Sequence, residues 1–597
     1  MISAQNHNPK LIIRSDDMGA FHSVNEACLL TVQQGLTTSI EVMTVTPWFP
    51  EAVKMLAKES SVDVGIHLTL TSEWENMKWR PLTSAASLTD SQGYFYPMLH
   101  PHEAYPGQAL TENEWTLEDI EQEFRAQIEL GLQAIPRISH LSGHMGCMSF
   151  DDRVLEVATR LAQEYHLTFI DGDKMKDKYN IEYVGYSGSN KTAEDKVNSF
   201  IATLSQLEKG KNYIFVDHPA LNNKEIETIG HIGYEWVPQD RQGVTDLLTN
   251  PRVKDAIDHH QIDLVSYVEV TKSLPRSMPK DEHVSISGIN NFLKAVKEEG
   301  HELHSFMMLR NGKVVAEQWF GDNTPLTPHA MYSVSKTFTA MALGFAVAEE
   351  RLNVTDKVVQ FFPDKLPKNP SEYLQTLCVK DLLTMSVGHN VQEASDKTNN
   401  NSDWVQALLS VPIETQPGLE FDYNSMATYL VSAIIQRVTG EKLLDYLTPR
   451  LFRPLGITNA TWDECPQGIA IGGYGLSVKT EDMAKLGQLI LQKGKWNDKQ
   501  LLPESWIDEM TTIHIASAPA GYKRKDVPIN PDDSDWLQGY GYQMWRCRHN
   551  GVRADGAYGQ FIIILPDKNA VVAITANISD MQNEINLVWD HILPALK

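Results

Sequence analysis

Up to about residue 270, short apolar runs alternate with longer segments in which apolar residues recur at helical spacing. The short runs predict strands and the longer segments predict helices. The expected strands are Leu11–Ile13, Ser39–Thr44, Val62–Leu70, Arg137–Leu141, Tyr213–Val216 and Ile262–Val268. The expected helices are Glu118–Leu132, Arg153–His166 and Val253–His260. This alternation predicts an α/β domain with a parallel sheet or barrel, whose chemistry lies at the carboxyl ends of the strands.

The pattern changes in the second half of the chain. Two pairs of apolar runs flank short turn sequences, Ser305–Leu309 with Val314–Trp319 and Gln560–Leu565 with Ala570–Thr575. The first turn contains Asn-Gly, a strong hairpin signal. Between the hairpins, helices are expected at Thr337–Glu349, Ala427–Thr439 and Thr480–Gln492. Hairpins near both ends with helices between them predict an α+β domain, whose antiparallel sheet is completed by its two ends.

A polar, proline-containing segment, T-K-S-L-P-R-S-M-P-K-D-E-H, separates the two patterns. A chain of 597 residues is too long for one hydrophobic core. We therefore expect one domain over residues 1–272, a linker over 273–285 and a second domain over 286–597.

Composition narrows the classes of partner and compartment. The formal net charge of −25 argues against nucleic acid or an anionic membrane as the main partner. The five cysteines are scattered without a C-x-x-C pair, which predicts buried free thiols in a reducing compartment. The first residues lack the apolar core of a signal peptide, and no apolar run reaches the ~18 residues of a membrane span. A cytoplasmic location is expected, and the oligomeric state is left open.

Chemically capable side chains follow several expected strands. R-S-D-D-M-G contains Asp16 and Asp17, V-G-I-H ends at His67, H-L-S-G-H ends at His144, and V-D-H-P contains His218. One carboxylate and two imidazoles leave positions for water, as in catalytic metal centres. Such a metal lowers the pKa of bound water from ~15.7 towards ~7, so a second carboxylate is needed to accept the proton. Each residue alone also fits a turn, a cap or an interior histidine, and the spacing by itself leaves both interpretations open.

In this order the four motifs resemble the YdjC-like carbohydrate deacetylase family, which includes chitooligosaccharide deacetylases, over roughly residues 8–275. The resemblance implies a (β/α)-barrel-like fold and a deacetylase with one divalent metal ion, Mg or Zn. It implies Asp17, His67 and His144 as metal ligands, Asp16 as the base and His218 as the acid that protonates the leaving amine.

The first half departs from that family in its third motif. Ser142 and Gly146 stand where members usually have an aspartate and further histidines, which puts the support of the ligands and the substrate range in question. His140 is expected at most to support the metal ligands from behind, without binding the metal itself. Several aromatic residues fit either sugar stacking or ordinary packing, namely Trp48, Trp74, Trp79, Tyr94 and Tyr96.

A second group of chemically capable residues begins with Y-S-V-S-K-T-F-T-A, which contains Ser333 and Lys336. Residues three apart on a helix share one face, so these two side chains can touch. The helix that follows is apolar nearly all round and should be buried. Burial lowers the pKa of a lysine and makes it a credible base for the serine hydroxyl. The Ser-x-x-Lys spacing alone is a weak signal.

Two further motifs, F-D-Y-N-S and A-D-G-A-Y-G-Q, accompany it. Together they resemble the serine β-lactamase/penicillin-binding-protein-like family, closest to its class C and esterase-type members, over about residues 286–597. The resemblance implies Ser333 as nucleophile, Lys336 as proton acceptor and Tyr423 as proton relay, with no cofactor. It also implies an oxyanion hole from the amides of Ser333 and of a residue after Gly556.

Two departures affect the expected substrate. Ser425 stands at the third position of the usual Tyr-x-Asn, with Asn424 beside it. Ala554 replaces the Lys or His that normally holds a substrate carboxylate, and only Arg553 is near. Esterase or amidase activity on a small acyl group is therefore favoured over β-lactamase or carboxypeptidase activity.

Taken together, the two halves predict a bifunctional hydrolase. The expected substrates are acetylated sugars or other small molecules from cell-wall or chitin turnover, a hypothesis that rests only on the co-occurrence of the halves. The alternative is a deacetylase fused to a non-catalytic, penicillin-binding-like sensor domain.

Overall fold

The computed structural model describes residues 8–59, 61–169 and 178–597. The chain forms two compact units, one ending at Ser273 and the other running from Leu274 to Lys597. We call them the N-terminal unit and the C-terminal unit, and each is described by itself.

The N-terminal unit is built on a parallel, half-barrel sheet with the strand order β5-β4-β3-β2-β1-β7-β6, in which β8 also pairs with β1. Its strands are β1 (Lys10–Met18), β2 (Ser39–Val42), β3 (Asp63–Leu68), β4 (His140–Gly143), β5 (Thr168–Phe169), β6 (Ile181–Val184), β7 (Asn212–Asp217) and β8 (Asp263–Leu264). Alternation along β1 separates two faces. Leu11 and Ile13 pack in a core shared with helices, whereas Ile12 lies in a small inner cluster with Tyr267.

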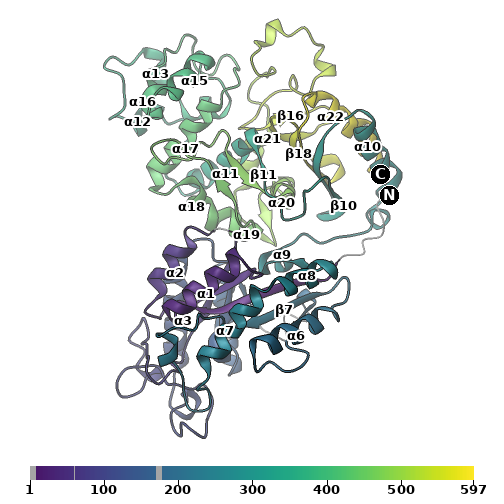
Figure 1. Cartoon of the computed structure of the whole chain (residues 1–597). Coiled ribbons are helices and arrows are strands. Elements are labelled where there is room, and N and C mark those ends of the chain that lie inside the picture. Colours follow the sequence, from purple (N-terminus) through teal and green to yellow (C-terminus); the bar gives the residue numbers. More distant parts are fainter. Residues whose placement is uncertain (1–7, 60, 170–177) are drawn as a thin grey trace. The chain divides into compact units, whose positions relative to one another are not determined.

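Helices accompany the strands of this unit (Figure 1). They are α1 (His22–Gln33), α2 (Phe49–Leu56), α3 (Leu117–Ala134), α4 (Asp152–Glu164), α6 (Ala193–Leu204), α7 (Val237–Leu248), α8 (Pro251–His259) and α9 (Tyr267–Thr271). Their starts follow local chemistry. Thr116 caps α3 by accepting the amide of Asp119, and two acids in the first turn favour its positive dipole end.

Most expected elements of the first half are confirmed, with two corrections. The run Ile262–Val268 is a strand only at Asp263–Leu264, and α9 then begins. Ser266 and Glu269 form a reciprocal capping box there, which starts a helix inside the apolar run. The fourth expected strand, Arg137–Leu141, begins only at His140.

The C-terminal unit contains an antiparallel sheet with the order β10-β9-β19-β18-β17-β16. Its strands are β9 (Leu303–Arg310), β10 (Lys313–Trp319), β16 (Trp545–Arg546), β17 (Val552–Gly556), β18 (Gln560–Leu565) and β19 (Ala570–Ala576). Both expected hairpins are confirmed, and Asn311 and Gly312 have φ values of 53° and 76°, as their turn requires. Pairing of β9 with β19 joins the beginning and the end of the unit.

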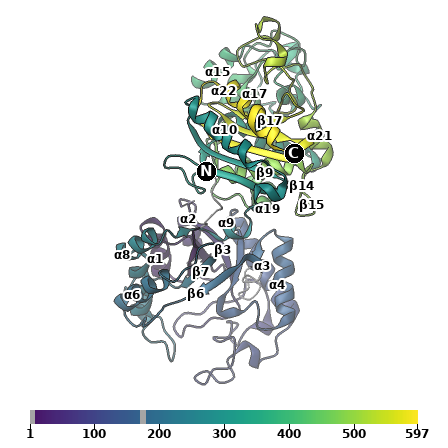
Figure 2. The same cartoon turned by 90° about the vertical axis from the view of Figure 1, so that its right-hand side faces the viewer.

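Helices cover both faces of this sheet (Figure 2). They are α10 (Ile286–Glu298), α11 (Ser335–Ala348), α12 (Val358–Phe361), α13 (Glu372–Thr376), α14 (Val379–Leu383), α15 (Val391–Asn399), α16 (Trp404–Leu409), α17 (Ser425–Thr439), α18 (Leu443–Leu447), α19 (Arg453–Leu455), α20 (Thr480–Leu491), α21 (Glu504–Thr511), α22 (Met581–Leu587) and α23 (Leu593–Ala595). Val571 and Ala573 of β19 face the core that contains α11, α17 and α20. Val572 and Ile574 face α10 and the C-terminal helices.

Three shorter strands form a separate sheet, in which β13 (Leu476–Val478) pairs with β11 (His329–Ala330) and β12 (Thr461–Trp462). A further sheet has two strands, β14 (Lys495–Trp496) and β15 (Lys499–Gln500). All five cysteines are buried and free, as expected. Across the described residues, every helix is too short or too polar to span a bilayer.

Candidate active sites

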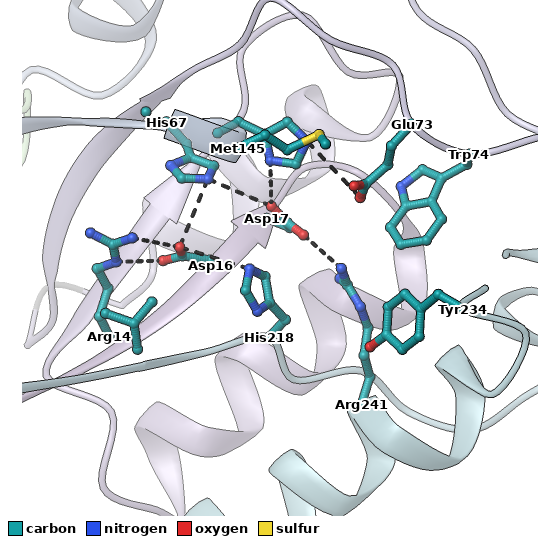
Figure 3. Close-up of a pocket in the computed structure, with 13 residues that line it drawn as sticks. Arg14, Asp16, Asp17, His67, Glu73, Trp74, Met145, His218, Tyr234 and Arg241 are labelled. Carbon is teal, nitrogen blue, oxygen red and sulfur yellow. Dashed lines mark hydrogen bonds and ion pairs between the residues drawn. The ribbon is translucent and has the colours of Figure 1, made fainter. Parts of the chain in front are cut away.

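In the N-terminal unit, the carboxyl ends of β1, β3 and β7 and the segment after β4 bring polar side chains to one pocket (Figure 3). Asp16 and Asp17 both reach it although they are neighbours on a strand. Successive strand residues normally point to opposite faces. Asp17 has a φ of 69°, so the chain is already turning there and both carboxylates face the same space.

Asp17, His67 and His144 converge. His67 Nε2 lies 3.7 Å and His144 Nδ1 lies 3.4 Å from Asp17 Oδ1, and one ligand atom from each residue lies within 4.8 Å of the other two. All three side chains are buried. Within the described part of the chain, Asp17 Oδ1 and His144 Nε2 have no hydrogen-bond partner. Burial lowers the pKa of His67 to about 4, which keeps the ring neutral, as a metal ligand must be. This donor set fits a divalent cation.

Asp16 is held by an arginine that sequence analysis missed. Arg14 donates from Nε to Oδ1 at 2.6 Å and from Nη2 to Oδ2 at 2.7 Å, and both side chains are buried. A bidentate pair of this kind fixes the carboxylate plane. Residues two apart share one face of a strand, so the sequence R-S-D did contain the signal. Asp16 Oδ2 also lies 3.8 Å from His67 Nε2.

His218 follows β7 and lies at the pocket with its side chain 39% exposed. Its Nε2 is 4.0 Å from Asp16 Oδ2, and its Nδ1 is 3.7 Å from Asp217 Oδ1. Burial disfavours the charged ring, but Asp17 and Asp217 outweigh it and raise the pKa of His218 to about 9. The raised pKa favours the protonated form of this imidazole.

Arg241 of α7 is the second arginine that the sequence did not reveal. Its Nη2 donates to Asp17 Oδ2 at 2.8 Å, and its guanidinium lies 5.1 Å from the centroid of the Trp74 ring. Burial alone would raise the pKa of Asp17, but Arg241, with His218 and His144, holds it well below its usual range. Because Arg241 and Asp17 are 224 residues apart, no local motif predicts their contact.

The pocket has a volume of about 400 Å³, and Glu73, Trp74 and Tyr234 are among the residues that line it. Of the five aromatic residues proposed for sugar contact, Trp74 lies in this lining. Trp79 is buried and donates to Thr71 O at 2.8 Å. Behind the pocket, Ser142 Oγ lies 2.8 Å from His67 Nδ1, and His140 is buried beside Glu41. Gly146 ends the short helical turn His144–Gly146.

In the C-terminal unit, Ser333 lies in a helical turn, Tyr332–Val334, that leads into α11. Lys336 Nζ contacts Ser333 Oγ at 2.8 Å, Ser425 Oγ at 3.0 Å and Gly473 O at 2.8 Å. Ser425 thus stands beside the lysine at the third position of the Tyr-x-Asn pattern. Burial lowers the pKa of Lys336 to about 7, against the opposing charge of Asp555.

Tyr423 lies beside this pair, with its ring centroid 4.8 Å from Lys336 Nζ. Burial and then Asp555 raise the pKa of its hydroxyl well above the usual value, so it stays protonated. Asn424 has a structural role. It caps α17 by accepting the amides of Met426 at 2.9 Å and Ala427 at 3.4 Å.

Gly556 ends β17 next to the segment that carries the serine. A Cβ at this position would lie 2.4 Å from Met331 O, so the glycine permits the close approach. Arg553 is engaged elsewhere. It is fully buried, donates from Nε to Asp555 Oδ2 at 2.8 Å, and stacks 4.5 Å from the centroid of Trp536. Arg553 is therefore no substitute for the missing substrate-binding cation at Ala554.

A carboxylate–imidazole site in a half-barrel and a Ser-x-x-Lys site in an α+β unit define a two-domain protein of the hydrolase class. The chain belongs to the Beta-lactamase family, whose model matches residues 294–596, and residues 10–259 match the model of the YdjC-like protein family. The YdjC-like deacetylases are a metal-dependent family, and the convergent donor set described above is consistent with it.

Individual relatives divide in the same way. A carbohydrate deacetylase of Enterococcus faecalis is 26% identical over 275 residues, which cover 44% of this chain and 97% of that protein. Protein flp of Staphylococcus aureus is 27% identical over 173 residues, 27% of this chain and 34% of flp. The chain thus spans about a third of the length of flp. An octameric penicillin-binding protein homologue from Pyrococcus abyssi is similar with a TM-score of 0.41 at 21% identity, over 52% of this chain and 77% of that chain.

Proposed function

We propose that the protein is a bifunctional hydrolase, in which the N-terminal unit removes acetyl groups from N-acetylated carbohydrates with a divalent metal and the C-terminal unit cleaves acyl esters or amides through an acyl-serine. The observation that carries the first activity is the convergence of Asp17, His67 and His144 beside an arginine-held Asp16. The name of the Enterococcus faecalis relative supports an acetylated sugar as the substrate.

In the deacetylase site, Asp17, His67 and His144 would hold Mg²⁺ or Zn²⁺. When bound, the cation supplies a Lewis acid that polarises the acyl carbonyl. Asp16, fixed by Arg14, takes the proton from the attacking water. His218, on the exposed side of the pocket, gives its proton to the amine that leaves. Trp74 offers a flat apolar wall for a sugar ring.

In the serine site, burial lowers the pKa of Lys336 to about 7, which supports a neutral amine as the base. In that form two N–H groups can serve Gly473 O and Ser425 Oγ, and the lone pair is left for the Ser333 hydroxyl. The hydroxyl proton passes to Lys336 while Ser333 Oγ bonds to the acyl carbon. The bond from the acyl carbon to the leaving alcohol or amine then breaks as Tyr423 gives that group a proton and takes one from Lys336. Water next attacks the acyl carbon, which frees the carboxylic acid and returns a proton to Ser333.

The test separates the two activities with matched variants of the full chain. Acetate release from N-acetylglucosamine oligomers should stop with a chelator or with Asp17→Asn, and should persist in Ser333→Ala. Labelling by a fluorophosphonate and hydrolysis of p-nitrophenyl acetate should stop in Ser333→Ala and persist in Asp17→Asn. A folded protein that resists the probe and hydrolyses no ester would instead be a deacetylase with a sensor domain.

A further inference from the structure

A continuous chain of buried hydrogen bonds runs behind His67, on the side away from the pocket. His67 Nδ1 lies 2.8 Å from Ser142 Oγ, and Ser142 donates to Glu41 Oε2 at 2.5 Å. Glu41 Oε1 lies 2.6 Å from His140 Nε2. Glu41 is fully buried and comes from β2, a strand that carries none of the site residues considered above.

The strand register explains how these groups meet. Glu41 pairs with Gly65 on β3, and Gly65 pairs with His140 on β4, so the three stand in one row across the sheet. His67 and Ser142 form the next row on the same face. A Cβ at position 65 would lie 2.3 Å from Glu41 Oε2 and 2.4 Å from His140 Nε2. Gly65 therefore leaves room for the Glu41 side chain to contact both rows, His140 in one and Ser142 in the other.

The direction of the hydrogen bonds follows from counting protons. The Ser142 hydroxyl has one proton and gives it to Glu41, which as a carboxylate only accepts. Burial alone would raise the pKa of Glu41, but His140 and then Arg14 lower it to about 2, so it remains ionised. Ser142 Oγ can then only accept from His67, which places the ring proton on Nδ1. The lone pair of His67 is left on Nε2, which faces Asp17 Oδ1 at 3.7 Å.

At the far end of this series of hydrogen bonds, the partners of His140 hold Glu41 in place. Ser139 donates to Asp63 Oδ1 at 2.6 Å, so it accepts from His140 Nδ1 at 2.7 Å. The other ring nitrogen, Nε2, lies 2.6 Å from Glu41 Oε1. Tyr267 packs against the imidazole, with the ring centroids 4.2 Å apart and the ring planes tilted by 37°.

We propose that Glu41, acting through Ser142, is a positioning residue that fixes His67 in the tautomer whose Nε2 can bind the metal. The proposal rests on the proposed metal-dependent deacetylase. It also gives a role to Ser142, one of the two departures from the family motif. Partners behind a ligand typically change metal affinity by about 10- to 100-fold.

The experiment measures Zn²⁺ affinity of the full chain by competition with a chromophoric chelator, with Asp17→Asn as the background without the site. Ser142→Ala should weaken binding by about 10- to 100-fold in a protein that remains folded at the assay temperature. Ser15→Ala is the matched control, because Ser15 is also a buried strand serine of this sheet and its hydroxyl bonds with Thr37 Oγ1 at 2.8 Å. Its affinity should stay within about twofold, since no ligand is touched.

Glu41→Gln supplies the second arm. A carboxamide can donate to Ser142, which then turns its proton towards His67, so affinity should fall about tenfold or more. In a Ser142→Ala background the same change should add less than about twofold, because the link is already broken. Wild-type affinity in a folded Ser142→Ala protein, or fully additive losses, would overturn the relay alone. A wild-type chain that binds Zn²⁺ no better than Asp17→Asn would overturn both the relay and the proposed deacetylase.

Discussion

Lys336 Nζ lies 2.8 Å from Ser333 Oγ in the C-terminal unit, and the lysine is 1% exposed. Burial lowers its pKa to about 7. A base must be neutral to take the serine proton, so activity is lost below this pKa and reaches a plateau above it. We expect kcat/KM for p-nitrophenyl acetate to fall about tenfold per pH unit below the midpoint. The measurement is a pH–rate profile from pH 5 to 9.

Asp555 provides the control for this assignment. Its charge favours the ammonium form of Lys336, so Asp555→Asn should move the midpoint to lower pH. Asp526→Asn, an exposed carboxylate in the same unit, should leave the midpoint in place. A midpoint near the ordinary lysine value, or an upward shift in Asp555→Asn, would contradict Lys336 as the base.

A change of Arg14 to lysine tests the geometry of its contact with Asp16 while the positive charge is kept. Arg14→Lys keeps a cation beside Asp16 but replaces the two-pronged contact by a point charge. We expect the rate of acetate release to fall about 10- to 100-fold, because Asp16 is no longer fixed as the base. The ester activity of the same protein should be unchanged.

A matched control exists in the same unit. Arg153 makes the same two-residue, bidentate contact with Asp151, at 2.9 Å in both bonds, but is 62% exposed. Arg153→Lys should therefore retain acetate release within about twofold, as expected for an exposed pair. Equal losses in both variants would indicate a general effect of replacing arginine.

The parts of the fold that sequence analysis predicted are those in which local chemistry and tertiary packing agree. The Asn311-Gly312 turn and the alternating residues on both sides define a hairpin without outside help. The run Ile262–Val268 shows the opposite case. Its apolar composition suits a strand, yet the Ser266–Glu269 capping box supplies donors and acceptors for a helix start, and this local interaction prevails.

The candidate sites show the same division. Asp17, His67 and His144 were expected together because their motifs resemble those of the YdjC-like family and follow expected parallel strands, whose carboxyl ends lie at one edge. Arg241 was missed because it lies 224 residues from Asp17 and meets it only in the folded chain. Glu41 was missed because a single acid within S-I-E-V-M gives no sign that two neighbouring strands supply its partners.

Metal binding should stabilise one unit alone. The two units have separate cores, so we expect two thermal transitions. Zn²⁺ at about 100 times its Kd adds roughly 2.7 kcal/mol to the native state that binds it. For a unit of this size, that raises one melting temperature by roughly 5–10 °C. Differential scanning calorimetry with and without Zn²⁺ measures the shift.

Asp17→Asn is the variant for this test, because Asp17 has a φ of 69° and asparagine tolerates this region better than alanine. The shift with Zn²⁺ should disappear in Asp17→Asn and persist in Asp255→Asn, which alters an exposed carboxylate of α8. A shift of both transitions in the wild type, or an undiminished shift in Asp17→Asn, would place the bound metal elsewhere.

Gly556 controls how closely β17 approaches the serine. A Cβ there would lie 2.4 Å from Met331 O, a backbone atom that cannot turn aside, so Gly556→Ala must displace the strand. The amide expected to complete the oxyanion hole follows this glycine, and loss of such a donor costs about 10²- to 10³-fold in kcat. We expect ester hydrolysis to fall by that amount while acetate release, in the other unit, continues as an internal control. Gly185→Ala, where no atom lies within 4 Å of the added methyl, should affect neither activity. Wild-type ester hydrolysis by Gly556→Ala would mean that catalysis does not depend on this close approach, and the oxyanion donor would have to be sought away from β17.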